Sequence, residues 1–423
     1  MKRVTTILVG LISLSALAWL ESKPEFQKNW PAWRGPLATG VALFGDPPTK
    51  WSENENVRWK IAIPGKGNSS PIVWGSTIFI TTAVEADSSE KTLRFEILAI
   101  NRRDGRIIWQ KTCRKEVPHE GTHHDGSFAS NSPVTDGEHV FAYFGSRGLY
   151  CFDMQGKLKW EKDLGDMNVK RGFGEGSSPV LHRNTIVVNW DHEGDSFIVG
   201  FDKRTGKEIW KTSRDEGTSW STPLIVEHED KPQVVVSATN RTRSYDLASG
   251  KLLWECSGMT ANTIPSPVAT DGVVYVTSGF RGSSMQASHL AQAHGDISGS
   301  AAIVWALDRD TPYVPSPLLY ENAIYFLKTN SGILTCVNAK TGETHYGPQR
   351  LEGISNIYAS PVGVNGRIYL VGRDGTVLII KHGPQFEVLA QNSLDDGFDA
   401  SPAIVDRELY LRGRKYLYCI AEE

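Results

Sequence analysis

The chain contains few of the short motifs that mark the common enzyme classes. Its 423 residues contain no GxSxG nucleophile elbow. The glycine-rich stretch GFGEGSS at 172–178 precedes a strand-like run rather than a helix, so it is a weak match to a phosphate-binding loop. The sequence therefore offers no nucleophilic triad.

Basic residues are not in excess and cysteines are few. With 45 Lys and Arg against 48 Asp and Glu, the net charge is −3, and we expect no nucleic-acid partner. The five cysteines are an odd number, and Cys151, Cys336 and Cys419 hold the same place in LYCFD, LTCVN and LYCIA. Equivalent places in separate repeats lie too far apart for a disulfide, which needs Cα atoms within ~7 Å. We therefore expect small, buried core residues.

The N-terminus has the layout of a secretory signal. Two basic residues precede an apolar run from about Val4 to Leu20, with an A-x-A motif at 16–18. This pattern predicts a signal peptide over 1–18 and an extension over 19–55, in a protein of the periplasm or cell surface. An uncleaved membrane anchor is the alternative, because the run is just long enough to span a bilayer.

A Ser-Pro or Thr-Pro dipeptide opens a strand-like run eight times. Most of the spacings between successive prolines lie between 41 and 50 residues, the range of propeller blades. The eight prolines are Pro71, Pro133, Pro179, Pro223, Pro267, Pro317, Pro361 and Pro402.

Within each period the pattern indicates four antiparallel strands. A glycine turn separates the third strand from a fourth that ends near tryptophan, as in FDKRTGKEIW. Trp59 holds a fourth-strand place with no strands before it, whereas the last repeat stops after its third strand. We therefore predict an all-β, eight-bladed β-propeller over 56–423, in which the N-terminal strand completes the C-terminal blade and closes the ring. The tryptophans are expected to pack between blades.

The repeats resemble the pyrroloquinoline-quinone (PQQ) repeat family, whose blade motif is A-x-D-x-x-T-G-x-x-x-W. The resemblance runs from about Trp30 to Glu423. The positions that carry it best are Asp202, Thr205, Gly206 and Trp210, then Asp246, Gly250 and Trp254, and Ala99, Asn101, Gly105 and Trp109.

The resemblance implies one of two activities. Quinoprotein dehydrogenases of this family bind PQQ, usually with Ca²⁺, often beside a disulfide between adjacent cysteines. BamB-like members serve as binding scaffolds in outer-membrane protein assembly. The chain has no adjacent cysteine pair and no CxxCH haem motif. We therefore expect a non-catalytic, monomeric binding propeller for a protein, peptide or envelope ligand, with no firmly bound cofactor. A PQQ-dependent oxidoreductase, with PQQ and Ca²⁺ bound, is the alternative.

One face of the propeller carries the unusual loops, which join second to third strands and fourth strands to the next blade. Arginine recurs in several of them, and a ring of guanidinium groups would suit a carboxylate or phosphate. Pairing with acidic residues of the same face is the alternative. The candidate anion-binding residues are Arg147, Arg241, Arg281, Arg373 and Arg412.

Two further loops of this face offer metal ligands. In PHEGTHHDG at 118–126, His119, His124 and Asp125 are the local candidates for a metal such as zinc. The alternative is a polar loop lying across the propeller mouth. WDHEGDS at 190–196 holds three carboxylates, which suit calcium or simply a solvated acidic hairpin.

Overall fold

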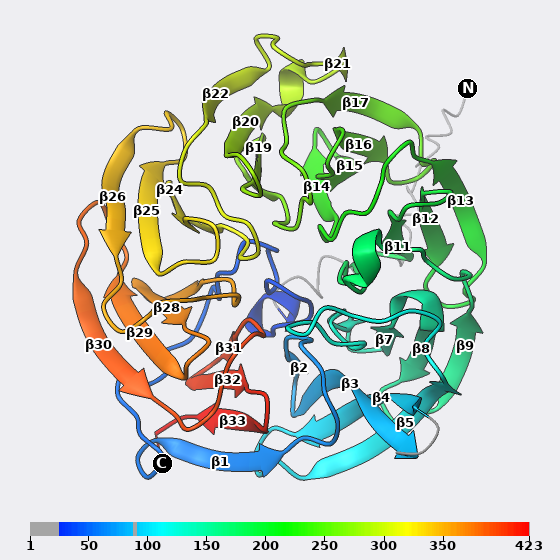
Figure 1. Ribbon diagram of the computed structural model, residues 1–423, viewed down its shortest axis with the longest axis vertical. Helices are drawn as coiled ribbons and strands as arrows, with labels where there is room; N and C mark the ends of the chain where they lie inside the picture. The colour runs from blue at the N-terminus through cyan, green and yellow to red at the C-terminus, as the bar shows by residue number, and fades with distance from the viewer. Residues whose placement is uncertain (1–24, 88–90, 423) are drawn as a thin grey trace, which may run out of the picture.

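The computed structural model describes residues 25–87 and 91–422, which form a ring of eight antiparallel sheets around a central channel (Figure 1). The predicted eight-bladed β-propeller is therefore confirmed. The predicted signal peptide at 1–18 lies outside the described residues. Within the described part of the chain, no helix has the length and apolar character needed to cross a bilayer.

Each blade contains four main strands, and the first of these lies nearest the channel. Blades 1 and 2 consist of β2 (Ile72–Trp74), β3 (Thr77–Asp87), β4 (Thr92–Asn101) and β5 (Ile107–Glu116), then β6 (Val134–Thr135), β7 (His139–Tyr143), β8 (Leu149–Asp153) and β9 (Leu158–Lys162). Blades 3 and 4 consist of β10 (Val180–His182), β11 (Thr185–Trp190), β12 (Phe197–Asp202) and β13 (Glu208–Ser213), then β14 (Leu224–His228), β15 (Lys231–Val236), β16 (Thr242–Asp246) and β17 (Leu252–Cys256).

The second half of the ring repeats this plan. Blades 5 and 6 consist of β18 (Val268–Thr270), β19 (Val273–Ser278), β20 (Ser284–His289) and β22 (Ile303–Leu307), then β23 (Leu318–Tyr320), β24 (Ala323–Leu327), β25 (Ile333–Asn338) and β26 (Thr344–Arg350). Blades 7 and 8 consist of β27 (Val362–Val364), β28 (Arg367–Val371), β29 (Thr376–Lys381) and β30 (Val388–Ser393), then β31 (Ala403–Val405), β32 (Glu408–Arg412), β33 (Tyr416–Ile420) and β1 (Val57–Ala62). The short 3-10 helices are η1 (Gly145–Arg147), η2 (Lys170–Gly172) and η3 (Leu290–Gln292).

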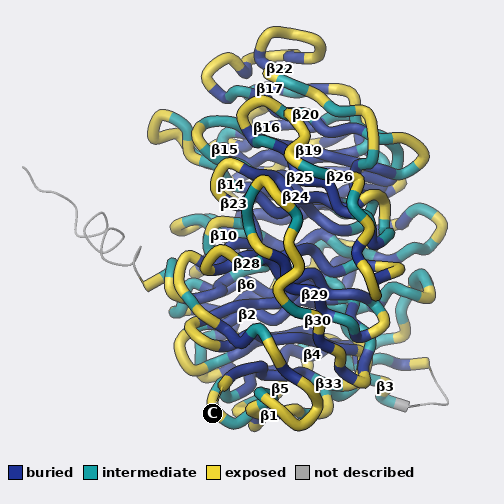
Figure 2. Tube along the Cα trace, turned by 90° about the vertical axis from the view of Figure 1, so that its left-hand side faces the viewer, coloured by how far each residue is buried: buried dark blue, intermediate teal, exposed yellow. Residues whose placement is uncertain are grey.

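Strand β1 closes the ring. It pairs antiparallel with β33, and Lys60 lies opposite Tyr418. The first and last strands of the propeller thus share one sheet, so the outer side of β33 is paired with β1 instead of exposed. Figure 2 shows the result, with the buried residues stacked through the interior and the exposed ones in the loops and outer strands.

The eight Ser-Pro and Thr-Pro dipeptides form a closed belt around the channel. In each blade the backbone N–H of the residue before proline donates to the side-chain hydroxyl of its counterpart in the next blade, at 2.9–3.0 Å. The sequence around the belt is Ser70, Ser132, Ser178, Thr222, Ser266, Ser316, Ser360, Ser401 and back to Ser70. Proline favours an extended backbone before it, which turns each N–H toward the neighbouring blade. We call this ring the hydroxyl belt.

The fourth-strand tryptophans join adjacent blades. Five of them donate their indole N–H to a backbone carbonyl in the third-to-fourth strand turn of the next blade, at 2.8–3.0 Å. These five are Trp59, Trp109, Trp160, Trp210 and Trp305. Each indole also lies against the glycine of that turn, where a Cβ would approach the ring within 3.0 Å. The motif's glycine and tryptophan are therefore partners across a blade interface.

In seven blades, the third-strand residue that pairs with the fourth-strand aromatic residue is small. The pairs are Trp59–Cys419, Trp109–Ala99, Trp160–Cys151, Trp210–Gly200, Trp254–Ser244, Trp305–Ala287 and Tyr346–Cys336. In blade 7 the sizes are exchanged, because Ala390 faces Ile379. In this blade the larger side chain of the pair therefore comes from the third strand. The small residue needed opposite the aromatic residue also explains the three equivalent cysteines, which are free and occupy this position.

Blade 5 departs from the common turn. The segment between β20 and β22 folds back onto blade 4, where β21 (Gly295–Asp296) pairs with β17 in parallel. Leu290 and Ile297 of this segment join the core around Trp254. Trp254 accordingly donates to Gln233 of its own blade, at 3.2 Å, rather than to the next blade.

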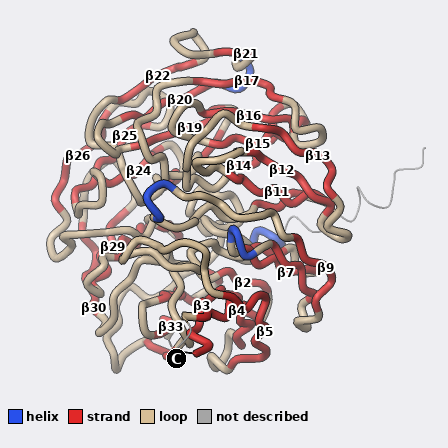
Figure 3. The backbone as a smooth tube through the Cα atoms, turned by 45° about the vertical axis from the view of Figure 1, so that its right-hand side comes forward, coloured by secondary structure: helices blue, strands red, loops and turns tan. Residues whose placement is uncertain are grey.

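The N-terminal extension crosses the channel, where Figure 1 shows it in blue. Backbone hydrogen bonds tie it to Val73, Thr135, Leu319 and Gly363, which belong to the first strands of four blades. Arg34 is 2% exposed and donates only to backbone carbonyls, including those of Pro317 and Pro361 at the belt. The extension therefore lies across one end of the channel. Figure 3 shows the loops that connect the strands in tan and the short helices in blue.

The glycine–tryptophan contact predicts that alanine substitution destabilises the protein more at Gly206 than at Gly366. Gly206 and Gly366 both have positive φ, +67° and +71°. A Cβ on Gly206 would lie 2.7 Å from Trp160, whereas nothing lies within 4 Å of one on Gly366. We expect Gly366→Ala to lower the free energy of unfolding by about 1–2 kcal/mol through backbone strain alone. Gly206→Ala is expected to cost about 1–3 kcal/mol more through overpacking.

Urea unfolding of the two variants measures this difference. Equal losses of stability would show that the indole does not restrict the Gly206 position.

Candidate functional site

A cavity of about 470 Å³ opens at the loop-rich end of the channel, and we call it the central cavity. Every connection from a fourth strand to the next blade contributes to its lining, so all eight blades share it. One lining residue from each connection, in chain order, is Asn68, Asp125, Phe173, Trp220, Ile264, Tyr313, Tyr358 and Asp399. This end of the channel is the face whose unusual loops stand out in the sequence.

Aromatic rings form much of the cavity wall. Phe280 and Tyr313 are stacked with their ring centroids 4.8 Å apart, and Phe173 lies 6.4 Å from Trp220. Trp33 reaches the cavity from the N-terminal extension. Such rings offer flat apolar surfaces to a ligand, while the indole N–H of Trp220 is held by the Gly174 carbonyl at 2.7 Å.

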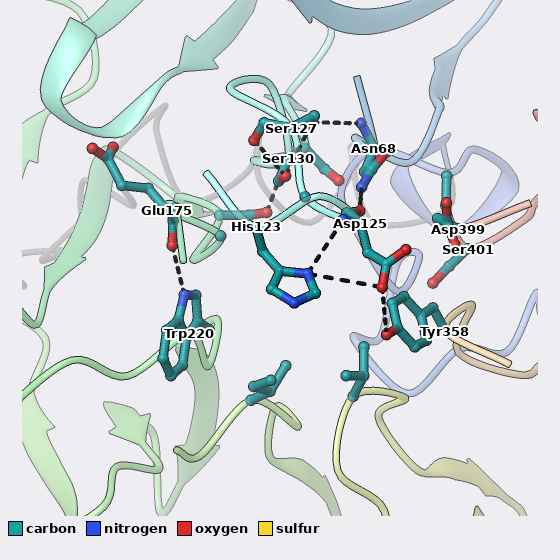
Figure 4. Close-up of a pocket in the computed structure, with 18 of the residues that line it drawn as sticks. Asn68, His123, Asp125, Ser127, Ser130, Glu175, Trp220, Tyr358, Asp399 and Ser401 are labelled. Carbon is teal, nitrogen blue, oxygen red and sulfur yellow. Dashed lines mark hydrogen bonds and ion pairs between the residues drawn. The ribbon is translucent and has the colours of Figure 1, made fainter. Parts of the chain in front are cut away.

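An ion-pair cluster borders this cavity. One carboxylate oxygen of Asp125 lies 2.7 Å from Arg373. The other accepts a hydrogen bond from Tyr358 at 3.2 Å (Figure 4). Arg373 also pairs with Asp399 at 2.5 Å and lies 4.0 Å above the Tyr358 ring. Arg414 adds a second guanidinium to Asp399, at 3.0 Å. Burial acts to raise the pKa of Asp125, but the hydrogen bond and charge of Arg373 outweigh it and hold that pKa below its usual range.

A second cavity, of about 630 Å³, lies beyond this cluster, and we call it the side cavity. It shares Asn68, Asp125 and Asp399 with the central cavity. Lys66 and Arg414 are among its other lining residues. The cluster therefore separates an aromatic, acidic chamber from one that holds basic groups.

Glu175 fixes the glycine-rich loop at 172–178. Its carboxylate accepts the backbone N–H and the hydroxyl of Ser146, at 2.7 and 2.6 Å, and pairs with Arg147 at 3.0 Å. Arg147 is 3% exposed and also lies 3.2 Å from Glu116. Burial raises the pKa of Glu175 against these favourable contacts. The loop is thus a blade-to-blade connector.

The five candidate arginines do not share one site. Arg147 and Arg373 are paired as described, and Arg241 pairs with Glu255 and Asp296 at 3.2 and 2.9 Å. Arg412 is 2% exposed and donates to the carbonyl and hydroxyl of Ser69. Arg281 is exposed beside the Phe280 ring. Among the residues described as lining the central cavity, none is Arg or Lys. Anion binding by these arginines stays a prediction, and pairing is the arrangement observed at three of them.

The structure brings two of the three candidate metal ligands together. His124 Nε2 lies 3.2 Å from Asp125, and His123 is the third member of the cluster, with all three ligand atoms within 4.8 Å of one another. His119 instead contacts the Met167 carbonyl at 2.7 Å and Arg147 at 3.1 Å. Since Arg373 and Tyr358 already bind Asp125, a metal would compete with both of them. The metal site therefore stays a prediction.

The acidic loop at 190–196 contains an ion pair that sequence reasoning missed. Asp191 makes a bidentate pair with Arg214 at 2.7 and 3.0 Å, and both side chains are 0% exposed. Glu193 of the same loop accepts the backbone N–H and hydroxyl of Thr218. No local pattern links Asp191 to Arg214, because they meet only when the loops of one blade fold over its end.

PQQ is a tricarboxylate, so a site for it needs cationic groups or a bound cation. The central cavity instead presents Asp125, Glu175 and Asp399, and its described lining includes neither Lys, Arg nor Cys. The donor set of this cavity therefore does not fit PQQ by itself.

The fold and site define an eight-bladed propeller of the PQQ-repeat class with a cavity at its mouth. The chain belongs to the family described as outer membrane protein assembly factor BamB, which matches at residues 49–169, 93–217 and 194–423.

A curated relative is the tetrathionate hydrolase of Acidithiobacillus ferrooxidans, 24% identical over 247 residues. The match covers 53% of this chain and 44% of that protein, so it spans less than half of the relative's length.

Solved structures share the fold at low identity. BamB from Moraxella catarrhalis is 13% identical with a TM-score of 0.57, covering 86% of this chain and 99% of that one. A europium-containing methanol dehydrogenase is 11% identical with a TM-score of 0.65, covering 93% and 90% of the two chains. The quinohemoprotein alcohol dehydrogenase from Comamonas testosteroni is 10% identical with a TM-score of 0.68, covering 96% and 82%. The propeller fold is thus common to BamB and to the two dehydrogenases.

Proposed function

We propose that the chain is an exported, non-catalytic binding propeller that takes a protein, peptide or cell-envelope ligand at the central cavity. Membership of the family described as BamB supports a binding role, and the secretory pattern at the N-terminus supports export.

The proposal rests on the ion pairs that hold the acidic groups of the cavity. Asp125 and Asp399 are joined by Arg373, and Glu175 is paired with Arg147. Each of the three carboxylates among the described lining residues is therefore ion-paired, and these pairs join five loops around the cavity. A cavity whose polar groups are fixed in advance loses little entropy when a ligand binds.

The test is photo-crosslinking in producing cells. A photoreactive phenylalanine analogue at Phe280, which lines the cavity, should form an adduct with an envelope component. The matched control is Ile108, 52% exposed on the outer strand β5, where no adduct is expected. Osmotic-shock release of the protein would support export. Adducts at neither position, or equally at both, would count against binding at the cavity.

A PQQ-dependent oxidoreductase is the second candidate, because the cavity is central and walled by aromatic rings that would stack on a planar quinone. Its test is incubation with PQQ and Ca²⁺ followed by dye reduction with primary alcohols. Dye reduction that depends on added PQQ would replace the binding proposal with the oxidoreductase.

A further inference from the structure

The hydroxyl belt supplies hydrogen-bond donors to the central cavity. Each belt hydroxyl accepts a backbone N–H from the preceding blade, and within the described chain none of the eight donates its own proton to a protein group. A hydroxyl has one proton to donate in addition to its acceptor sites. Six of these hydroxyls line the cavity, namely Ser70, Ser132, Ser178, Thr222, Ser360 and Ser401. Their protons are available to a ligand that offers oxygen acceptors.

Hydrogen-bond acceptors line the same cavity. Asp125 and Asp399 keep acceptor sites beyond those that Arg373 and Arg414 use, because a carboxylate accepts about four hydrogen bonds. Asn68 uses its amide N–H₂ on the Asp125 carbonyl, at 3.0 Å, which leaves its amide oxygen for a ligand. A bound molecule that both accepts and donates hydrogen bonds would satisfy both sets of groups.

The charges around the cavity disfavour ions of either sign. An anion would find no Lys or Arg among the described lining residues, because the arginines that pair with Asp125, Glu175 and Asp399 do not line the cavity. A cation would find those carboxylates already paired with arginines and would meet the donor protons of the belt. A neutral polar ligand avoids both costs.

The aromatic wall adds a requirement for apolar faces. Trp33, Trp220 and the stacked Phe280–Tyr313 pair present flat surfaces beside the polar groups. A pyranose ring has hydroxyls at its edge and C–H groups on its faces, so it matches the belt, the carboxylates and the rings together. The cavity volume of about 470 Å³ is within the range of small-ligand sites and accommodates a mono- or disaccharide.

We propose that the ligand of the central cavity is a neutral saccharide, held by the hydroxyl belt and the aromatic wall. This inference rests on the proposed binding function and names its ligand class. The probes are cellobiose, maltose and N,N′-diacetylchitobiose, titrated while tryptophan fluorescence is followed, since Trp33 and Trp220 line the site. At least one should bind saturably, and the dianionic digalacturonate should bind at least about tenfold more weakly than that sugar.

The belt offers a matched pair of variants. Ser360 and Ser316 each accept one belt hydrogen bond, but only Ser360 lines the cavity. Ser360→Ala is expected to weaken saccharide binding about three- to tenfold, the effect of one neutral hydrogen bond, whereas Ser316→Ala should leave it within about twofold. Both variants lose the same kind of structural bond, so equal loss of binding would mean that the belt acts only on the fold and would overturn the assignment.

The outcomes of the two experiments distinguish the saccharide inference from the proposed binding function on which it rests. Absence of binding by all three neutral sugars, or tighter binding of digalacturonate, would overturn the saccharide. A protein adduct from the Phe280 position together with silent sugar titrations would leave the binding function standing with another ligand. Failure of both experiments would remove the two proposals together.

Discussion

Replacing Asp191 with alanine is expected to lower the free energy of unfolding by about 3–5 kcal/mol. Asp191 and Arg214 are both 0% exposed and bonded through two N–H···O contacts. Removing the carboxylate leaves a buried guanidinium whose remaining side-chain hydrogen-bond partner, within the described residues, is the Tyr245 hydroxyl, at 2.6 Å. The uncompensated charge, rather than the lost contact, accounts for most of the expected loss.

Two controls identify the cause. Glu387→Ala removes an ion pair of similar length, 3.0 Å to Lys381, whose side chains are 54% and 59% exposed. It should change stability by at most about 1 kcal/mol. The double variant Asp191→Leu with Arg214→Met replaces both charges by apolar groups and should recover most of the loss. Urea unfolding followed by circular dichroism gives all three values. A double variant no more stable than Asp191→Ala would show that the hydrogen bonds of Ser219 and Asn189 to Asp191 matter more than the charge.

Trp210→Ala is expected to cost about 3–5 kcal/mol, the usual loss for a buried tryptophan. Trp210 is 7% exposed, donates to the Leu247 carbonyl at 2.8 Å and covers Gly250 of the next blade. Across its own sheet it faces Gly200, where the three atoms nearest to an added Cβ all belong to the Trp210 ring. Gly200 is therefore small because Trp210 is large.

Blade 7 supplies the matched rescue. Its equivalent pair, Ala390 and Ile379, carries the bulk on the third strand instead of the fourth. Adding Gly200→Ile to Trp210→Ala copies that arrangement and should recover at least about 1 kcal/mol by refilling the space. Gly200→Ile alone should destabilise, because the new side chain would overlap the indole. Thermal and urea unfolding of the three variants test this, and additive losses in the double variant would exclude volume exchange between the strands.

The belt, the tryptophan interfaces and the cavity are connected features of the ring. Belt hydroxyls hold the channel ends of the blades, and indoles hold the outer strands against the next turn. Between them the loops are free to vary, since they do not carry the closure of the ring. A rigid scaffold with variable mouth loops is an arrangement suited to ligand binding, which agrees with the function that we propose.

The site was only partly predictable from the chain. The structure places the central cavity at the loop-rich face, whose connections depart from simple turns in the sequence. The pairing of Arg373 with Asp125 joins residues 248 positions apart in the chain, and no local spacing indicates such a contact. For the same reason the sequence offers His119 and His124 as equivalent candidates, although of these two only His124 lies beside Asp125.

The sequence by itself determined the architecture. Eight repeats of one pattern specify eight copies of one blade, because strand periodicity and turn chemistry act over a few residues. The first strand of the chain has the pattern of a fourth strand, and this specifies that it completes the last blade and closes the ring. Only the tertiary structure decided what the repeats build together. The eight Ser-Pro and Thr-Pro hydroxyls become a single belt, the cysteines become the small partners of aromatic residues, and the acidic loop at 190–196 becomes half of a buried ion pair. Each of these depends on which side chains meet across a blade or between blades, and that is fixed by packing around the ring rather than by neighbours along the chain.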